Sequence, residues 1–180
     1  MSNKKRVLCI LENGFEEIEA IAPVNLLRRA GIEVVTAGVS AMEVNGKCGI
    51  CVTTDTLLDE ISGDHYDALF IPGGPAVMTL RKNPDIIALI QAFHGDGKPI
   101  ATICAAPLLL KDAGILTGKR ITAHFSTADE LPELTGNRIE LDAKLLTSRG
   151  AGTAIEFGLA FVALLAGETA AADVSRAIMA

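Results

Sequence analysis

The stretch Ile100-Ala-Thr-Ile-Cys104-Ala-Ala-Pro107-Leu-Leu-Leu110 decides the fold of this chain. Its first four residues predict a buried strand over Ile100–Ile103, and the proline predicts a helix over Pro107–Ala113. A strand that turns into a helix through small residues displays its pivotal side chain at the end of the sheet, as in a nucleophile elbow. Cys104 occupies that pivotal position.

The same alternation of strand and helix patterns continues outward in both directions. Strands are predicted at Arg6–Leu11, Glu33–Val39, Ala68–Ile71, Ile100–Ile103, Arg120–Ala123 and Leu145–Thr147. Helices are predicted at Glu16–Ala30, Pro84–Phe93, Pro107–Ala113, Thr127–Leu131, Thr153–Leu165 and Ala170–Ile178. Asn45-Gly46 predicts a hairpin turn between Met42–Val44 and Cys48–Thr53. The pattern indicates one α/β domain over residues 1–180, with a mainly parallel sheet, helices on both faces and a small β-hairpin.

Charge and composition exclude several classes of protein. The chain has 16 Lys and Arg against 22 Asp and Glu, a net charge of -6, so no nucleic-acid partner is expected. Its longest apolar stretches, Ile100–Leu110 and Phe157–Ala166, are too short to span a bilayer, so no membrane partner is expected. The first residues lack the pattern of a secretory signal, and four irregularly placed cysteines are typical of reduced thiols. We therefore expect a cytoplasmic protein.

No cofactor or metal site is expected from the motifs. The first strand is followed by Gly14 alone rather than by the three glycines of a dinucleotide fingerprint, and no P-loop occurs. Cys48-Gly-Ile-Cys51 has the spacing of a redox motif, but residues i and i+3 of a strand point to opposite faces. Neither a disulfide nor a shared zinc is therefore expected there, and no second ligand pair for zinc is present.

Cys104 and Glu19 are candidates for proton and thiolate chemistry. A helix that begins just after Cys104 is expected to lower the pKa of its thiol, whereas the alternative is an inert thiol of the core. Glu16 and Glu17 suit the positive start of a helix. Glu19 lies one turn further along among apolar residues, where partial burial raises the pKa of a carboxyl group and lets it carry a proton near neutrality.

Other candidate residues follow neighbouring strands. The backbone of Gly73 and Gly74 could hold an oxyanion, because glycine lets N–H groups approach a ligand closely. His124 follows the strand predicted at Arg120–Ala123 and would share the rim of the sheet with Cys104. We interpret Ser148–Thr153 as a tight strand-to-helix turn, with an anion-binding nest as the alternative.

The helix predicted at Thr153–Leu165 is apolar nearly all round, with Glu156 as its only charge. Such a helix is either enclosed within its own domain or buried against another subunit. A homodimer is therefore a plausible assembly.

Taken together, these motifs resemble the ThiJ/PfpI superfamily, and most closely the branch of the Parkinson-disease protein deglycase and its bacterial homologues. The resemblance extends from about Lys5 to Ala166. It rests on Gly14-Phe-Glu-Glu-Ile-Glu19, Arg28-Arg-Ala-Gly-Ile32, Tyr66-Asp-Ala-Leu-Phe-Ile-Pro-Gly-Gly74, Ala101-Thr-Ile-Cys-Ala-Ala-Pro107, Thr122-Ala-His124 and Leu146-Thr-Ser-Arg-Gly-Ala-Gly-Thr153. It implies a flavodoxin-like fold and a dimer.

The resemblance also implies roles for individual residues. Cys104 matches the reactive cysteine, Glu19 the protonated glutamate bonded to it, and His124 the nearby histidine. Gly74 and Ala105 match the backbone donors that face the bound oxygen. Ala105 stands where the peptidase-like branch has a histidine, which argues against proteolysis. Ala106 and Ala151 replace the glycine and proline that are common in the closest relatives, and this alters the expected shape of the pocket.

The resemblance implies a cofactor-independent enzyme that acts on small reactive carbonyls in stress protection. A glyoxalase would convert methylglyoxal to lactate, and a deglycase would repair early glycation adducts. The alternative is a redox-sensing or chaperone-like dimer that responds to oxidation of Cys104. An amidase or peptidase is a third interpretation, which requires His124 to lie within hydrogen-bond reach of Cys104.

Overall fold

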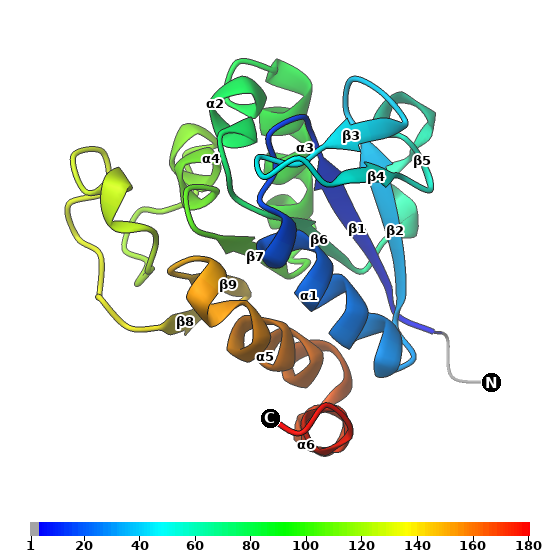
Figure 1. The fold of residues 1–180 in the computed structure, drawn as a ribbon. Coiled ribbons are helices and arrows are strands. Elements are labelled where there is room, and N and C mark those ends of the chain that lie inside the picture. Colours follow the sequence, from blue (N-terminus) through cyan, green and yellow to red (C-terminus); the bar gives the residue numbers. More distant parts are fainter. Residues whose placement is uncertain (1–3) are drawn as a thin grey trace.

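The computed structural model describes residues 4–180 and is built around a seven-stranded sheet (Figure 1). The strand order is β5-β2-β1-β6-β7-β9-β8, and every neighbouring pair is parallel except β9 with β8. The strands are β1 (Arg6–Leu11), β2 (Glu33–Gly38), β5 (Thr56–Leu57), β6 (Ala68–Ile71), β7 (Ile100–Ile103), β8 (Ile139–Asp142) and β9 (Leu145–Ser148). β3 (Glu43–Asn45) and β4 (Cys51–Thr53) form a separate antiparallel hairpin.

Helices cover both faces of the sheet, so the predicted fold class is confirmed (Figure 1). The α-helices are α1 (Glu17–Arg29), α2 (Ala76–Leu80), α3 (Pro84–Gly95), α4 (Pro107–Asp112), α5 (Ala154–Ala166) and α6 (Glu168–Ala177). None of them combines the length and apolar character needed to cross a membrane, among the residues that the structure describes.

Alternation along each strand divides the core into two layers, because successive side chains point to opposite faces. On one face, Cys9 of β1 and Phe70 of β6 pack with α1 and α5, and the Phe70 and Phe157 ring centroids lie 5.7 Å apart. On the other face, Leu8 and Leu69 pack with α3 and α4. The parallel strands are buried on both faces and therefore read as continuous apolar runs.

Helix α5 packs against its own chain on one face and leaves Ile155 exposed on the other. It contacts α1, α6 and strands of the sheet. Gly158 allows α1 to approach closely, because a Cβ atom there would lie 3.0 Å from the Cα of Pro23. Packing within one chain accounts for the buried face of α5, and exposed Ile155 at its start is consistent with burial against another subunit.

The strand predicted at Arg120–Ala123 is wrong, because this segment joins no sheet. The N–H group of Thr122 donates to the hydroxyl of Thr147 at 3.0 Å, and the N–H group of Arg120 donates to the Asp142 carboxylate. β8, which was not predicted, occupies the edge of β9 instead. The helix predicted at Thr127–Leu131 is also wrong; a single 3₁₀ turn at Phe125–Thr127 stands there, followed by turns.

The hairpin exists, but Asn45-Gly46 is not a two-residue turn. Asn45 pairs directly with Cys51, and five residues, 46–50, form the loop between the strands. The loop closes around Glu17, whose carboxylate accepts the N–H groups of Cys48 at 2.7 Å and Ile50 at 3.3 Å. A tertiary contact with α1 therefore sets the loop length. Cys48 lies in the loop, not in a strand as predicted.

The chain order places a switch point at the middle of the sheet. The connection after β1 leads to β2 on one side of β1. The connection after β6 leads to β7, which lies farther out on the other side. Ligands of open parallel sheets bind beyond the carboxyl ends of the strands at such a point. The residues that follow β1, β6 and β7 are therefore the place to look for a site.

Candidate active site

Cys104 stands on a strained turn directly after β7. Its φ angle is +65°, a left-handed conformation that costs most residues energy. Two backbone hydrogen bonds hold the turn, since its N–H group donates to Ser148 O and its carbonyl accepts the N–H of His124, both at 2.9 Å. The residue is partly exposed. This is the geometry of a nucleophile elbow.

Glu19 brings a buried carboxyl group to the Cys104 sulfur. Only 2% of Glu19 is exposed. Its N–H group donates to the Glu16 carboxylate at 2.8 Å, which caps α1 and fixes the first turn of the helix. The Glu19 carboxyl accepts the N–H of Gly73 at 3.1 Å and forms a side-chain hydrogen bond with Cys104. Burial raises the pKa of Glu19 to about 7.

The paired glycines leave room for this contact. A Cβ atom on Gly73 would lie 2.5 Å from the Cβ of Cys104 and would also collide with the Glu19 carboxyl. Gly74 has a φ of +94°, and a side chain there would meet the carbonyl oxygen of Gly14. The backbone N–H groups of Gly74 and Ala105 both hydrogen-bond to the sulfur of Cys104.

The expected lowering of the Cys104 pKa is wrong for this pair. Burial and the adjacent Glu19 carboxylate raise the pKa of Cys104 to about 12, although the N–H groups of Gly74 and Ala105 act in the opposite direction. The helix that follows has only six residues, and its dipole does not overcome a neighbouring negative charge. Between pH values of about 7 and about 12 the pair carries one negative charge. A thiolate forms there when the thiol proton passes to Glu19.

His124 lies at the same rim but does not pair with Cys104. Its Nδ1 lies 2.8 Å from the hydroxyl of Ser126 and accepts the Ser126 N–H at 3.3 Å, so the neutral ring carries its proton on Nε2. Its ring stacks on Phe125 with centroids 4.1 Å apart. No hydrogen bond joins its side chain to Cys104 within residues 4–180.

Gly150 is a site residue that the sequence reasoning did not single out. Its φ of +154° disfavours a side chain, and a Cβ atom would lie 3.5 Å from Glu19 Oε1 and 3.6 Å from His124 Cδ2. The sequence could have indicated this residue, because it lies shortly after the end of a predicted strand, where ligand sites of parallel sheets are found. The turn around it is closed by Thr153, whose hydroxyl donates to Gly150 O at 2.7 Å, as expected for a strand-to-helix turn.

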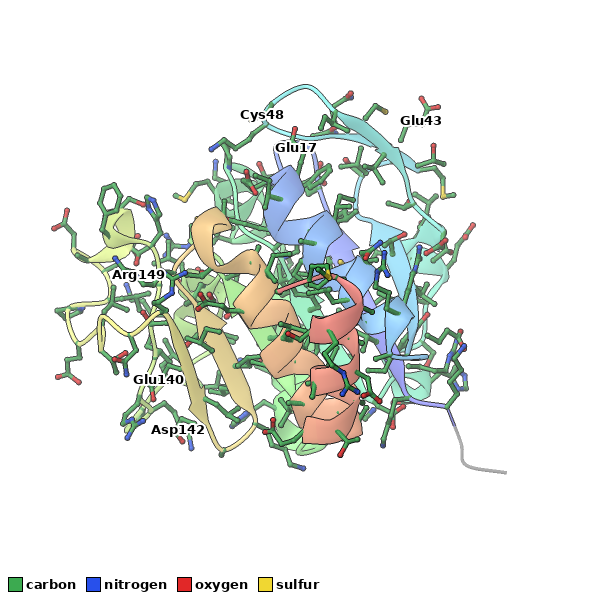
Figure 2. All side chains as sticks on the ribbon, turned by 60° about the horizontal axis from the view of Figure 1, so that its bottom comes forward. Glu17, Glu43, Cys48, Glu140, Asp142 and Arg149 are labelled. Atoms are coloured by element: carbon green, nitrogen blue, oxygen red, sulfur yellow. The ribbon has the colours of Figure 1, made fainter. Side chains whose placement is uncertain are left out.

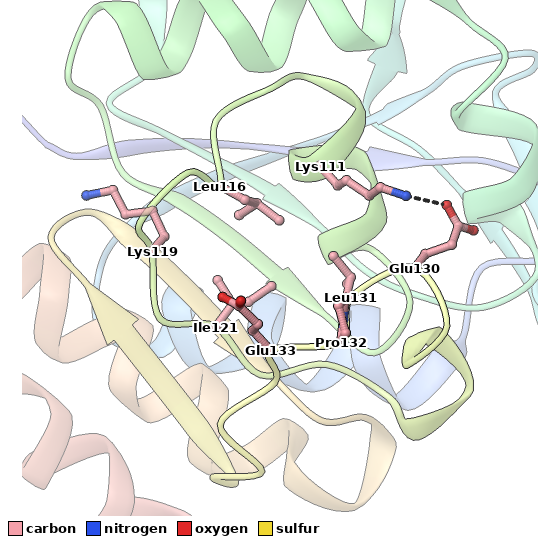
Figure 3. A pocket seen from close by; sticks show the side chains of 8 residues that line it. All are labelled: Lys111, Leu116, Lys119, Ile121, Glu130, Leu131, Pro132 and Glu133. Carbon is pink, nitrogen blue, oxygen red and sulfur yellow. Dashed lines mark hydrogen bonds and ion pairs between the residues drawn. The ribbon is translucent and has the colours of Figure 1, made fainter.

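A cleft of about 650 Å³ opens beside this turn, and it is lined by His124, Phe125, Arg149 and the turn itself. Arg149 follows β9 and faces the segment between α4 and β8 (Figure 2). A second cavity, of about 160 Å³, lies against α4, where Lys111 and Glu130 pair at 2.9 Å (Figure 3). Gly150 and His124, which line the larger cleft, adjoin the Cys104 turn, so this cleft is the candidate substrate site.

The remaining cysteines form no metal site. Cys9 is buried in β1, and burial raises the pKa of its thiol far above the ordinary range. Cys48 and Cys51 are exposed on the hairpin. No three metal-ligating side chains come together in the part of the chain that the structure describes.

Comparison with known proteins identifies the family. The model of the DJ-1/PfpI family matches residues 5–164. The chain belongs to the DJ-1/PfpI family. It is 33% identical over 164 residues to deglycase TK1284 of Thermococcus kodakarensis, which covers 89% of this chain and 99% of the relative.

Solved structures of the DJ-1/PfpI family share the fold over nearly the whole chain. The structure of the VC2308 protein superposes with a TM-score of 0.93 at 36% identity, over 99% of this chain and 94% of the other. Oxidized DJ-1 of Toxoplasma gondii superposes with a TM-score of 0.92 at 32% identity, over 97% and 98% of the two chains. The predicted family is confirmed.

The pairing of Glu19 with Cys104 predicts how thiol reactivity depends on pH. In a Cys48→Ser, Cys51→Ser background, the rate of alkylation of Cys104 by iodoacetamide rises as the pH increases through about 7, because the ionised Glu19 accepts the thiol proton. In Glu19→Gln this inflection disappears, because no carboxylate accepts the proton, and the rate rises only where the thiol itself ionises, at or above its ordinary value of 9.0.

Mass spectrometry of the alkylated peptide measures the rate, and Glu16→Gln, which keeps Glu19, is the control. At pH 7.5 we expect Glu19→Gln to react about 10-fold more slowly, because loss of the group that accepts the thiol proton outweighs removal of a charge that raises the thiol pKa. An unchanged profile in Glu19→Gln would show that the carboxyl does not govern the thiol.

Proposed function

We propose that this protein is a cysteine-dependent enzyme that acts on small reactive carbonyls without a cofactor. One observation carries the proposal: the Cys104 sulfur lies at the elbow, partly exposed, between a buried proton acceptor and two N–H donors. Addition to a carbonyl requires a nucleophile in contact with a base and with donors that hold the developing oxyanion. Several relatives of this chain are named deglycases, which supports the same class of substrate.

Methylglyoxal illustrates the reaction. Glu19 takes the thiol proton, and the Cys104 sulfur attacks the aldehyde carbon to form a hemithioacetal whose oxygen faces the N–H groups of Gly74 and Ala105. Protonated Glu19 returns its proton to this oxygen. The hydrogen on the aldehyde carbon then moves to the ketone carbon, and the hydroxyl proton moves to the ketone oxygen, which leaves a lactoyl thioester on the sulfur. Water cleaves the carbon–sulfur bond, releasing lactate and restoring the thiol.

A glycation adduct would enter the same sequence. The hemithioacetal or aminocarbinol first yields its free thiol or amine, and the carbonyl fragment leaves as the hydroxy acid. The deglycase and the glyoxalase activities therefore need the same sulfur and the same proton acceptor. They differ only in the group that leaves the carbonyl carbon.

Replacement of Cys104 tests this chemistry directly. In Cys104→Ala we expect formation of lactate from methylglyoxal to fall to the rate in buffer alone, because no other thiol lines the site among residues 4–180. The matched control is Cys51→Ala, which removes an exposed thiol from the hairpin and leaves the rate unchanged. Lactate formed at the wild-type rate by Cys104→Ala would end the proposal.

Redox sensing is a second candidate function, supported by the partial exposure of a sulfur that already faces two N–H donors. Two equivalents of peroxide would convert the thiol to a sulfinate with release of water, and the same N–H groups could bind its oxygens. We expect mass spectrometry after mild peroxide treatment to show two added oxygens on Cys104 and none on buried Cys9. An unmodified Cys104 in protein that turns over methylglyoxal would favour the enzyme alone.

A peptidase or amidase is not supported by this geometry. Such an enzyme needs a base beside the thiolate, and the Nδ1 edge of His124 is engaged with Ser126. The position after the nucleophile holds Ala105, which can supply only its backbone N–H.

We also propose that the protein is a homodimer. Four exposed isoleucines share a groove of about 620 Å³ beside α1, and they are Ile18, Ile21, Ile50 and Ile155. Exposed apolar surface of this kind is typical of protein interfaces, and the groove joins α1, the hairpin loop and the start of α5. A second copy of the chain that covers the groove would bury all three elements.

Light scattering after gel filtration tests the assembly. Wild type is expected to elute at twice the chain mass of 18.8 kDa, and Ile21→Glu at the mass of one chain, because a charge in an apolar interface is not solvated. Met78→Glu, on the exposed side of α2, is the control that leaves the mass unchanged. Wild type that elutes at 18.8 kDa would refute the dimer.

A further inference from the structure

An uncompensated positive charge lines the cleft beside Cys104. The cleft of about 650 Å³ has two arginines in its wall, Arg138 and Arg149. No Asp or Glu is among the described residues that line it. The availability of each arginine to a ligand therefore depends on its partners outside the lining.

The two arginines differ in their partners. The Arg138 guanidinium is bound to the Glu156 carboxylate at 2.7 to 3.0 Å and also donates to Gly152 O. Its charge is therefore neutralised and these donors are occupied within the chain. The Arg149 side chain forms no hydrogen bond or ion pair with any residue from 4 to 180; only its backbone N–H is bound, to Arg138 O at 3.3 Å. Arg149 therefore keeps its whole set of donors for a ligand.

Arg149 directly follows the β9 residue that holds the Cys104 turn. Cys104 donates its N–H to Ser148 O, and Arg149 is the next residue along the chain. Gly150 follows, and a side chain there would fill the space between the cleft and the pair, since its Cβ would lie 3.5 Å from Glu19 Oε1 and 4.0 Å from Cys104 Cβ. The glycine thus keeps the cleft open toward the site of reaction.

We propose that Arg149 selects reactive carbonyls that carry a second, anionic group. The inference rests on the proposed function and specifies its substrate class: 2-oxoaldehydes with a carboxylate two or three bonds from the ketone. Guanidinium binds a carboxylate through two parallel N–H donors, which fixes the orientation of a ligand. Phe125, 80% exposed and stacked on His124, offers an apolar wall for the carbon chain between the two groups.

The reaction itself is unchanged by this selection. A 2-oxoaldehyde gains one water and becomes a 2-hydroxy acid, with the sulfur of Cys104 and the carboxyl of Glu19 in the roles given above. Arg149 neither forms nor breaks a bond. It is a specificity residue, and its effect is expected in KM for the anionic substrate.

A matched pair of substrates tests the proposal. 4,5-Dioxopentanoate and 2-oxopentanal have the same dicarbonyl end, and they differ in a terminal carboxylate in place of a methyl group. We expect wild type to favour the anionic substrate in kcat/KM, and Arg149→Met to lower the ratio of the two kcat/KM values about 10-fold, the effect of losing a charged hydrogen-bonded pair. Arg149→Lys should keep part of the preference.

Arg176→Met is the control for loss of a positive charge, because Arg176 lies on α6, which contributes no residue to the cleft. It should leave the ratio unchanged. Added salt should lower the wild-type preference and leave that of Arg149→Met unaltered. Equal kcat/KM values for the two substrates in wild type, or the same ratio in wild type and Arg149→Met, would overturn the proposal.

Binding separates this proposal from the proposed function. If wild type converts neither substrate, the carbonyl activity fails, but the anion site can still be tested with the products on Cys104→Ala. Calorimetry should then show tighter binding of 2-hydroxyglutarate than of 2-hydroxypentanoate, and the difference should be lost in Cys104→Ala, Arg149→Met. Equal binding of the two acids would show that Arg149 selects no anion.

Discussion

The contact between one buried carboxyl and one partly exposed sulfur constrains the rest of the site. Glu19 lies on α1 and Cys104 follows β7. Gly73, which follows β6, donates the N–H group that holds the Glu19 carboxyl. Each of the three groups lies beyond the carboxyl end of a different strand, namely β1, β6 and β7. The carboxyl can hold a proton near neutrality because burial disfavours its charged form, and the nearby Glu16 carboxylate acts in the same direction.

Glu17 and Glu19 show how surroundings assign different properties to carboxyl groups on one helix. Burial acts to raise the pKa of both. For Glu17, the N–H groups of Cys48 and Ile50 outweigh burial and lower the pKa, so this residue stays ionised and anchors the hairpin loop. Glu19 receives one backbone N–H and a hydrogen bond from Cys104, and these lower its pKa too little to offset burial. The number of donors, not burial alone, separates an anchor from a proton carrier.

The strained turn at Cys104 joins the chemistry to the binding surface. Ser148 and His124 hold its backbone through hydrogen bonds, and the residues that follow them in the chain, Arg149 and Phe125, line the cleft. Any shift of β9 or of the segment at His124 would therefore move the sulfur and the cleft together. This coupling shows how residues distant in sequence position the proposed nucleophile and the cleft together.

The sequence alone determined the alternation of strands and helices, the elbow at Cys104 and the family, because these depend on local apolar periods and on short motifs around fixed backbone turns. It also indicated a raised pKa for Glu19, since apolar neighbours in a helix imply burial. It failed where the partner of a segment is distant. Arg120–Ala123 has the composition of a strand, but side chains of Thr147 and Asp142 take its N–H groups.

Only the tertiary structure decided the electrostatics of the site. The local pattern predicted a helix start after Cys104 and hence a lowered thiol pKa. Packing instead places the charge of Glu19 against the sulfur. A full charge nearby outweighs the dipole of a short helix. The hairpin loop, the role of Gly150 and the unpaired state of Arg149 were likewise set by contacts between segments far apart in the chain. Charge interactions depend on distance in space, and the order of residues does not fix that distance until the sheet has formed.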